Sequence, residues 1–86
     1  MKVVINKCYG GFSISKEAME LLGVDSPYPD IKRNDPALVE VVEKLGDKAN
    51  GSFSKLKIVE IPDDVEWDIA EYDGLEWVEE VHRTWS

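Results

Sequence analysis

The sequence has little cysteine, little histidine and no long apolar run, and each shortage argues against a class of protein. A single cysteine, Cys8, cannot form an internal disulfide, so a disulfide-stabilised secreted fold is not expected. One cysteine and one histidine are too few for a structural zinc site. No segment approaches the roughly 20 apolar residues of a membrane span, and the run at residues 3–5 is too short for a signal peptide. We expect a cytoplasmic protein with no metal, no cofactor and no membrane contact.

Basic residues are nearly absent from the last third of the chain. Residues 60–86 hold ten Asp and Glu but only one Lys or Arg, Arg83, whereas residues 1–59 hold eight acids and nine Lys and Arg. The formal net charge is −8. Such an acidic region repels phosphates, so direct nucleic-acid binding is not expected. The region is either a solvated face that favours solubility or a surface offered to a basic partner, in the manner of a nucleic-acid mimic.

The length of 86 residues predicts one domain, residues 1–86, with a small core. Association into a homo-oligomer would add stability to a chain this short.

The first half of the chain carries clear signals for one strand and two helices. Residues 2–6 are rich in β-branched side chains and predict a strand. Ser15 is the expected N-cap of a helix that runs to Leu22 and ends at Gly23. Two prolines and several turn-forming residues between residues 24 and 35 predict a loop.

A second helix is expected to begin with Asp35 as N-cap and Pro36 at its first position. Its apolar residues recur with helical spacing, which is typical of an amphipathic helix, and they are Leu38, Val41, Val42 and Leu45. Gly46 ends this helix, residues 46–52 form a turn-rich connection, and residues 55–61 predict a strand.

Residues 65–82 predict a β-hairpin, although a helix over residues 64–72 is a competing interpretation. A three-residue loop at residues 72–74, with Gly74 in the left-handed conformation, pairs Glu71 with Leu75. A two-residue turn would shift the pairing by one residue and mix the faces, so we predict the three-residue loop. In that register one face is apolar and buried, with Val65, Trp67, Ile69, Leu75, Trp77 and Val81. The opposite, exposed face carries Glu66, Asp68, Glu76, Glu80 and His82.

The resulting order β-α-α-β-β-β predicts an α+β fold. We expect a mostly antiparallel four-stranded sheet with the two helices on one face.

The segment 6-NKCYGGFSIS-15 places a glycine-rich turn between a strand and a helix start, a layout that binds phosphate groups. Its spacing matches neither of the common glycine-rich phosphate motifs. The alternative is a turn that needs backbone freedom at Gly10 and Gly11. As a binding loop it would contribute Lys7, Tyr9 and Ser13.

The segment 82-HRTWS-86 provides a second group of candidate binding residues, His82, Arg83 and Trp85. An Arg and a Trp at strand spacing can stack on a base and hold a phosphate. Alternatively, Arg83 offsets neighbouring carboxylates and Trp85 packs at the edge of the core. If the first and last strands are neighbours, the two groups of residues converge on one pocket.

Catalytic chemistry is not indicated by the sequence. Nothing orients Cys8 and His82 as nucleophile and base, and no oxyanion-hole pattern is present. Asp63, Asp64 and Asp68 do not fit a calcium-loop pattern. We therefore assign no catalytic residue and no metal ligand.

Three long runs resemble a family of small bacteriophage and prophage proteins. They are 4-VINKCYGGFSIS-15, 34-NDPALVEVVEKLGDKANG-51 and 56-LKIVEIPDDVEWDIAEYDGLEWVEEVHRTW-85, which cover most of the chain. The resemblance implies a phage-encoded protein of the host cytoplasm and brings no established catalytic residue. Small phage accessory proteins often counter host defence, which suggests two hypotheses by analogy. The first is capture of a small anionic ligand such as a nucleotide immune signal, and the second is an acidic inhibitor that binds a host protein.

Overall fold

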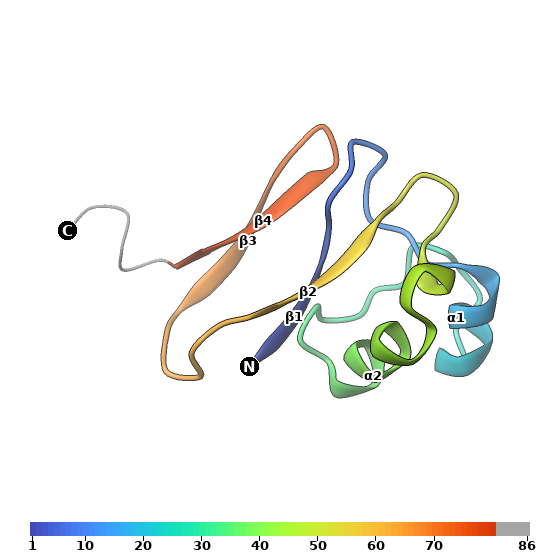
Figure 1. The fold of residues 1–86 in the computed structure, drawn as a ribbon, viewed down its shortest axis with the longest axis horizontal. Coiled ribbons are helices and arrows are strands. Elements are labelled where there is room, and N and C mark those ends of the chain that lie inside the picture. The colour runs from blue at the N-terminus through green and yellow to red at the C-terminus, as the bar shows by residue number, and fades with distance from the viewer. Residues whose placement is uncertain (81–86) are drawn as a thin grey trace.

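The structure is a computed structural model that describes residues 1–80 of the 86-residue chain. It confirms the α+β class and the predicted order of elements (Figure 1). A short 3₁₀ helix is added directly after the second α-helix. The elements are β1 (Lys2–Asn6), α1 (Lys16–Leu22), α2 (Pro36–Leu45), the 3₁₀ helix η1 (Gly46–Ala49), β2 (Leu56–Glu60), β3 (Trp67–Tyr72) and β4 (Leu75–Glu80).

Both α-helices begin at the residues that the sequence indicated. The Ser15 hydroxyl accepts a hydrogen bond from the Ala18 N–H at the start of α1, and the Asp35 carboxylate accepts one from the Ala37 N–H at the start of α2. Helix α1 ends at Gly23, whose φ of 70° is left-handed as expected. Gly46 ends α2, but the chain then winds into η1, because the turn-forming residues there still allow one tight helical turn.

The core lies between the helices and the β1–β2 pair. Helix α2 packs against both strands and α1 packs against α2 (Figure 1). In the antiparallel β1–β2 pair Val4 lies opposite Ile58, and Val4 points into the core. The buried core residues are Val4, Ile14, Ala18, Leu38, Val39, Val41, Val42 and Ala49.

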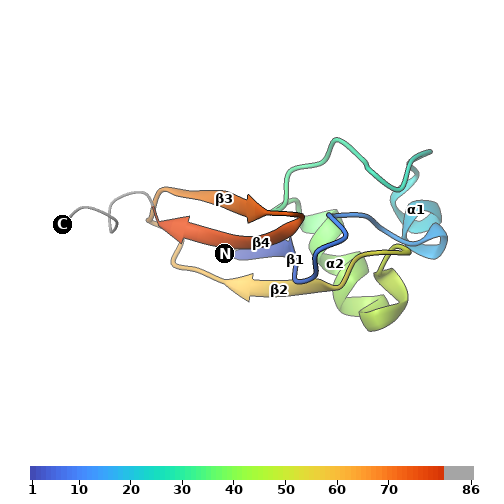
Figure 2. The same ribbon diagram turned by 90° about the horizontal axis from the view of Figure 1, so that it is seen from above.

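The four strands form two antiparallel pairs, β1–β2 and β3–β4, in place of the predicted four-stranded sheet. Seen from above, the strands still lie in the order β3, β4, β1, β2 (Figure 2). Strands β1 and β4 are therefore neighbours, but the two-stranded sheets to which they belong are separate. We call this junction the β1–β4 seam.

Side chains and a loop occupy the positions on β1 that a third strand would use. The Val4 N–H donates to the Arg33 carbonyl oxygen at 2.8 Å. The Asn6 N–H donates to the Glu76 carboxylate, also at 2.8 Å. On its other edge β1 continues to pair with the β2 side, because the Lys7 N–H donates to the Lys55 carbonyl oxygen. The N–H groups of Val4 and Asn6 on this edge of β1 are thus bonded to groups other than the backbone of β4.

The hairpin turn has two residues, Asp73 and Gly74, so the predicted three-residue loop is wrong. Both residues have positive φ, 51° and 90°, as a type I′ turn requires. Tyr72 therefore lies opposite Leu75, and Trp67 lies opposite Glu80. The alternative helix over residues 64–72 is also wrong, because β3 covers most of that range.

The shift of one residue rearranges both faces of the hairpin. The inner face carries Trp67, Ile69, Glu71, Glu76, Val78 and Glu80, and the outer face carries Asp68, Ala70, Tyr72, Leu75, Trp77 and Glu79.

Burial in the hairpin differs most from the prediction at Glu76, Glu80 and Trp77. Val65, Ile69 and Leu75, which were expected to be buried, are half-buried, and Val81 lies outside the described residues. Glu76 is only 6% exposed, Glu80 is half-buried, and Trp77 is 38% exposed. Glu76 is buried because Arg33 and the Asn6 N–H satisfy its carboxylate. Trp67 is half-buried, while Glu66 and Asp68 are exposed as predicted.

None of the helices within residues 1–80 has the length and apolarity that a membrane crossing needs.

Candidate functional site

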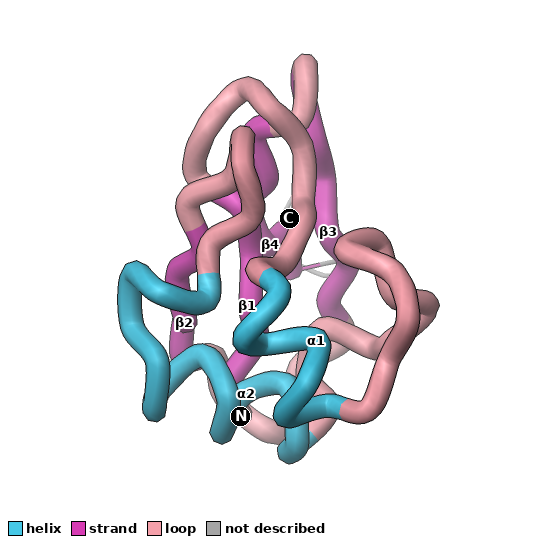
Figure 3. The backbone as a smooth tube through the Cα atoms, turned by 90° about the vertical axis from the view of Figure 1, so that its right-hand side faces the viewer, coloured by secondary structure: helices cyan, strands magenta, loops and turns pink. Residues whose placement is uncertain are grey.

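A cleft of about 440 Å³ lies beside the start of α1. Its walls come from the end of the glycine-rich segment, from the loop between α1 and α2, and from the loop after η1. The α1–α2 loop is drawn in pink in Figure 3 and contributes Pro27 and Tyr28. The lining residues are Gly10, Ser13, Ile14, Ser15, Lys16, Met19, Pro27, Tyr28, Asn50, Gly51, Ser52 and Phe53.

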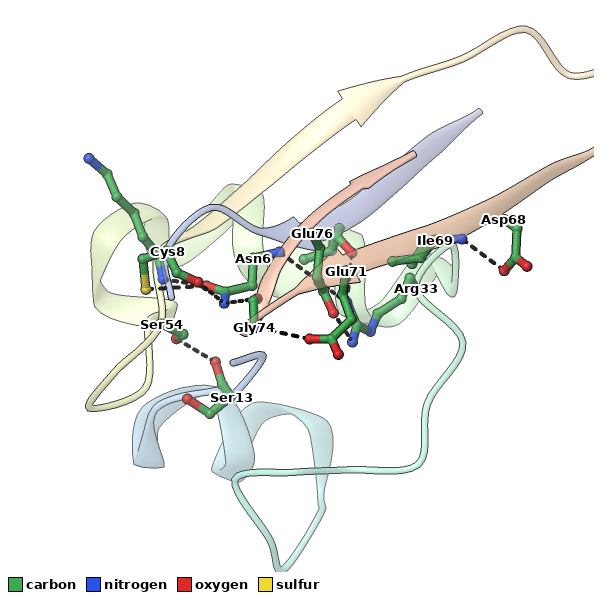
Figure 4. Close-up of polar contacts among 12 residues, drawn as sticks. Asn6, Cys8, Ser13, Arg33, Ser54, Asp68, Ile69, Glu71, Gly74 and Glu76 are labelled. Carbon is green, nitrogen blue, oxygen red and sulfur yellow. Dashed lines mark hydrogen bonds and ion pairs between the residues drawn. The ribbon is translucent and has the colours of Figure 1, made fainter. Parts of the chain in front are cut away.

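Hydrogen bonds between these segments hold the walls of the cleft in place. The Ile14 N–H donates to the Pro27 carbonyl oxygen, and the Ser15 N–H donates to the Ala49 carbonyl oxygen, both at 2.9 Å. The Ser54 hydroxyl donates to the Ser13 carbonyl oxygen at 2.7 Å (Figure 4). Three segments that are distant in sequence are thus bonded to one another, and the cleft is largely preformed.

Two glycines allow the close contacts behind this wall. A Cβ atom at Gly10 would overlap the backbone of Phe53, and a Cβ atom at Gly51 would overlap the side chain of Ser13. Gly10 therefore permits the loop that carries Phe53 to lie directly against the glycine-rich turn.

The side chains at the cleft combine two aromatic rings with one positive charge. Tyr28 is 69% exposed and Phe53 is 74% exposed, although both rings are apolar enough to favour burial. Lys16 supplies an ammonium group, and the described lining residues include no carboxylate. Hydroxyl and amide groups of Ser13, Ser52 and Asn50 add hydrogen-bonding capacity. This combination suits a flat aromatic ligand that carries negative charge.

Of the binding residues predicted from the sequence, Ser13 lines the cleft. Lys7 and Tyr9 are exposed, and neither is among the residues that line this cleft. His82, Arg83 and Trp85 lie outside the described residues. The strands β1 and β4 are neighbours, but the convergence of the two predicted groups on one pocket stays a prediction.

The sequence interpretation missed Lys16, Tyr28 and Phe53. Tyr28 had a local signal, because an aromatic residue between Pro27 and Pro29 is held in a loop where it has little chance to enter the core. Lys16 directly follows the helix cap Ser15, so it lies at the first position of α1, next to the glycine-rich turn. Nothing local indicated that the loop carrying Phe53 would pack against Gly10, since that contact spans more than forty residues.

The polar atoms at the start of the glycine-rich segment are used in internal contacts. Asn6 is fully buried, and its amide Nδ2 donates to the carbonyl oxygens of Cys8 and Gly74, each at 2.7 Å (Figure 4). The Cys8 thiol donates to the Phe53 carbonyl oxygen at 2.9 Å. Gly11 has a φ of 89°. These contacts favour the interpretation of residues 6–11 as a turn that needs backbone freedom.

No set of three or more His, Cys, Asp or Glu side chains within residues 1–80 is arranged to hold a metal ion.

Comparisons with family models, curated proteins and solved structures gave no match to this chain.

Proposed function

We propose that the protein captures a small anionic ligand with a planar ring, such as a nucleotide, and holds it without chemical change. The observation that carries this proposal is the cleft beside α1, whose lining within residues 1–80 combines two exposed aromatic rings with one lysine and no carboxylate. Its volume of about 440 Å³ lies within the range of about 300–1,000 Å³ that is usual for small-molecule sites.

The residues of the cleft have distinct roles in this proposal. The ring of the ligand stacks on Tyr28 or Phe53, an interaction that contributes about 1–3 kcal/mol per base in nucleic-acid complexes. The Lys16 ammonium pairs with the phosphate. The side-chain oxygen of Asn50 already accepts a hydrogen bond from the Leu56 N–H at 2.8 Å. This bond fixes the Asn50 side chain and leaves its NH₂ group as the donor toward the ligand.

The resemblance to phage proteins supplies a setting for such binding. A phage protein that sequesters a nucleotide immune signal lowers the free concentration of that signal in the infected cell. This role requires affinity and abundance but no catalytic residue, which fits a site built only from stacking, charge and hydrogen bonds.

Thermal-shift measurements test the proposal directly. The protein is heated with 5′-AMP, with cyclic AMP and with cyclic dinucleotides, and adenosine serves as the uncharged control. A ligand at 100 times its Kd adds about 2.7 kcal/mol to the free energy of unfolding, which raises the Tm of a domain this small by on the order of 10 °C. Adenosine is expected to give a smaller shift, because it lacks the charge that pairs with Lys16. If no nucleotide raises the Tm, the proposal is wrong.

Matched pairs of variants locate the site. Tyr28→Ala and Lys16→Ala remove exposed groups from the cleft, whereas Tyr9→Ala and Lys7→Ala remove the same chemical groups from the predicted loop site. We expect the cleft variants to weaken nucleotide binding by about 5- to 150-fold, the equivalent of 1–3 kcal/mol, and the other two to bind like the parent. The reverse pattern would place the site on the glycine-rich loop.

A further inference from the structure

The outer face of the β3–β4 hairpin exposes aromatic side chains on a sheet at one side of the molecule. Strand β3 packs against β4, and in Figure 2 it lies at one edge of the row of four strands, with β2 at the other edge. On this face Tyr72 is 66% exposed and Trp77 is 38% exposed. The Trp77 indole N–H donates to the Glu79 carboxylate at 3.1 Å, so the ring is held beside an acidic group.

Like charges face each other directly across this surface. Asp68 lies opposite Glu79 in the β3–β4 register, and like charges at such positions destabilise a sheet. Within residues 1–80 no Lys or Arg forms an ion pair with either carboxylate. On the inner face Glu71 lies opposite Glu76 in the same way, but there Arg33 neutralises Glu76. Among the residues that the structure describes, the outer pair thus retains a repulsion that a bound cation would relieve.

The charge of the surroundings decides what kind of partner can dock on this face. Residues 60–80 hold ten Asp and Glu and no Lys or Arg. A second copy of the hairpin would bring carboxylates against carboxylates, and a nucleic acid would bring phosphates. A cationic partner is attracted, and its Arg or Lys side chains can lie over the Trp77 ring while they pair with the flanking carboxylates.

We propose that the outer face docks an extended basic segment of another protein, with Arg or Lys at alternate positions. Trp77 and Glu79 are two residues apart on one strand, a separation of about 6.7 Å. Basic residues at positions i and i+2 of an extended peptide present their charges on one side at the same interval. This surface is independent of the nucleotide cleft, which is built from the other elements of the fold.

Two seven-residue peptides of identical composition test the spacing. One alternates Arg and Thr, and the other has four Arg followed by three Thr. The intact protein is titrated with each peptide in low salt, and backbone amide shifts are followed by NMR. We expect the alternating peptide to shift the amides of β3 and β4 and to bind several-fold more tightly than the block peptide. Equal affinity of the two peptides, or shifts outside the hairpin, would overturn the proposal.

A charge-matched pair of variants separates docking from general attraction. Asp68→Asn with Glu79→Gln removes the facing carboxylates, and Glu20→Gln with Asp25→Asn removes two exposed carboxylates elsewhere. We expect the first pair to weaken binding of the alternating peptide about three- to tenfold and the second pair to change it by less than twofold. Trp77→Ala is also expected to weaken binding. An equal effect of both pairs would mean that only net charge attracts the peptide, and the proposal would fail.

Discussion

At the scale of single residues, Glu76 connects more parts of the molecule than any local pattern suggested. Its carboxylate accepts hydrogen bonds from the Asn6 N–H of β1 and from both terminal nitrogens of Arg33 in the α1–α2 loop. The Arg33 guanidinium in turn lies over the Phe12 ring, 3.6 Å from its centroid. One buried acid thus joins the hairpin, β1 and the long loop.

Replacement of Glu76 by Ala is expected to lower the free energy of unfolding by about 3–5 kcal/mol. The variant leaves the Arg33 charge and the Asn6 N–H without their partner in a site largely shielded from water. Urea unfolding measures the loss. The double variant Arg33→Met, Glu76→Leu removes both charges and should be less destabilised than Glu76→Ala, since no buried charge is stranded. A double variant that is as unstable as the sum of two single ones would contradict this account.

The exposed pair of Lys2 and Glu43 provides the control for the buried one. Both side chains are nearly half exposed, and the Lys2 Nζ lies 2.7 Å from the Glu43 Oε2. The Glu43 carboxylate accepts the Lys2 hydrogen bond and attracts its charge, which raises the pKa of Lys2 above its usual 10.5. The contribution of this pair is complete below pH 10.5 and is lost as the pH rises through the raised pKa. Lys2→Met should therefore destabilise the protein far less than Glu76→Ala at neutral pH.

At the scale of elements, the turn of the hairpin depends on Gly74. Its φ is +90°, and a Cβ atom there would overlap the backbone of Gly11. Gly74→Val is expected to cost more than about 2 kcal/mol, since the left-handed conformation alone costs about 1–2 kcal/mol for an ordinary residue and the overlap adds to it. Urea or thermal unfolding measures the effect.

Asp73→Asn is the matched control for the turn, because Asn-Gly is at least as favourable as Asp-Gly in a type I′ turn. We expect that variant to unfold like the parent. If Gly74→Val were tolerated equally well, the two-residue turn would be the wrong description of residues 72–75.

The ends of the helices could be predicted because their signals are local. Ser15 and Asp35 form their caps with residues two or three positions along the chain, and Gly23 needs only its own backbone conformation. The hairpin register could not be predicted from the same kind of pattern. The prediction assumed that Trp77 must be buried and Glu76 exposed. Glu76 is instead buried, because its carboxylate pairs with Arg33, a residue 43 positions earlier in the sequence.

The candidate site likewise contains one residue that a local sequence pattern indicates and others that depend on contacts between distant segments. Ser13 could be identified because it lies in a glycine-rich turn before a helix, a local pattern. Tyr28 and Phe53 meet at the cleft only through contacts between distant loops, such as the bond from Ile14 to Pro27. The cleft is formed by tertiary packing. Its walls outside the glycine-rich segment could therefore not be predicted from periodicity or motifs.

At the scale of the whole molecule, charge is separated along the chain and in space. Residues 1–59, which form the body, hold nine Lys and Arg and eight Asp and Glu. Residues 60–80 hold ten Asp and Glu and no Lys or Arg. The hairpin that carries most of these acids extends away from the helices (Figure 1). The proposed anionic ligand and the proposed basic segment would therefore bind at regions of different charge.

Added salt is expected to raise the Tm. Repulsion among the acids of residues 60–80 destabilises the folded state, and the screening length falls from about 30 Å at 0.01 M salt to about 10 Å at 0.1 M. Calorimetry across this range measures the rise. The variant Asp68→Asn, Glu79→Gln should show a smaller rise. A Tm that falls with salt would mean that favourable ion pairs, such as Lys2 with Glu43, outweigh the repulsion.

The β1–β4 seam also affects how this fold can change during evolution. The backbone ladder of a continuous sheet tolerates nearly every substitution except proline, because its bonds belong to the main chain. At the seam the attachment depends instead on the identity of the side chains of Asn6 and Glu76. Replacement of the Glu76 side chain would remove bonds between the hairpin and β1, whereas the backbone bonds of the β1–β2 pair do not involve that side chain. Sequences that keep this fold are therefore expected to keep a carboxylate at position 76 and an amide side chain at position 6.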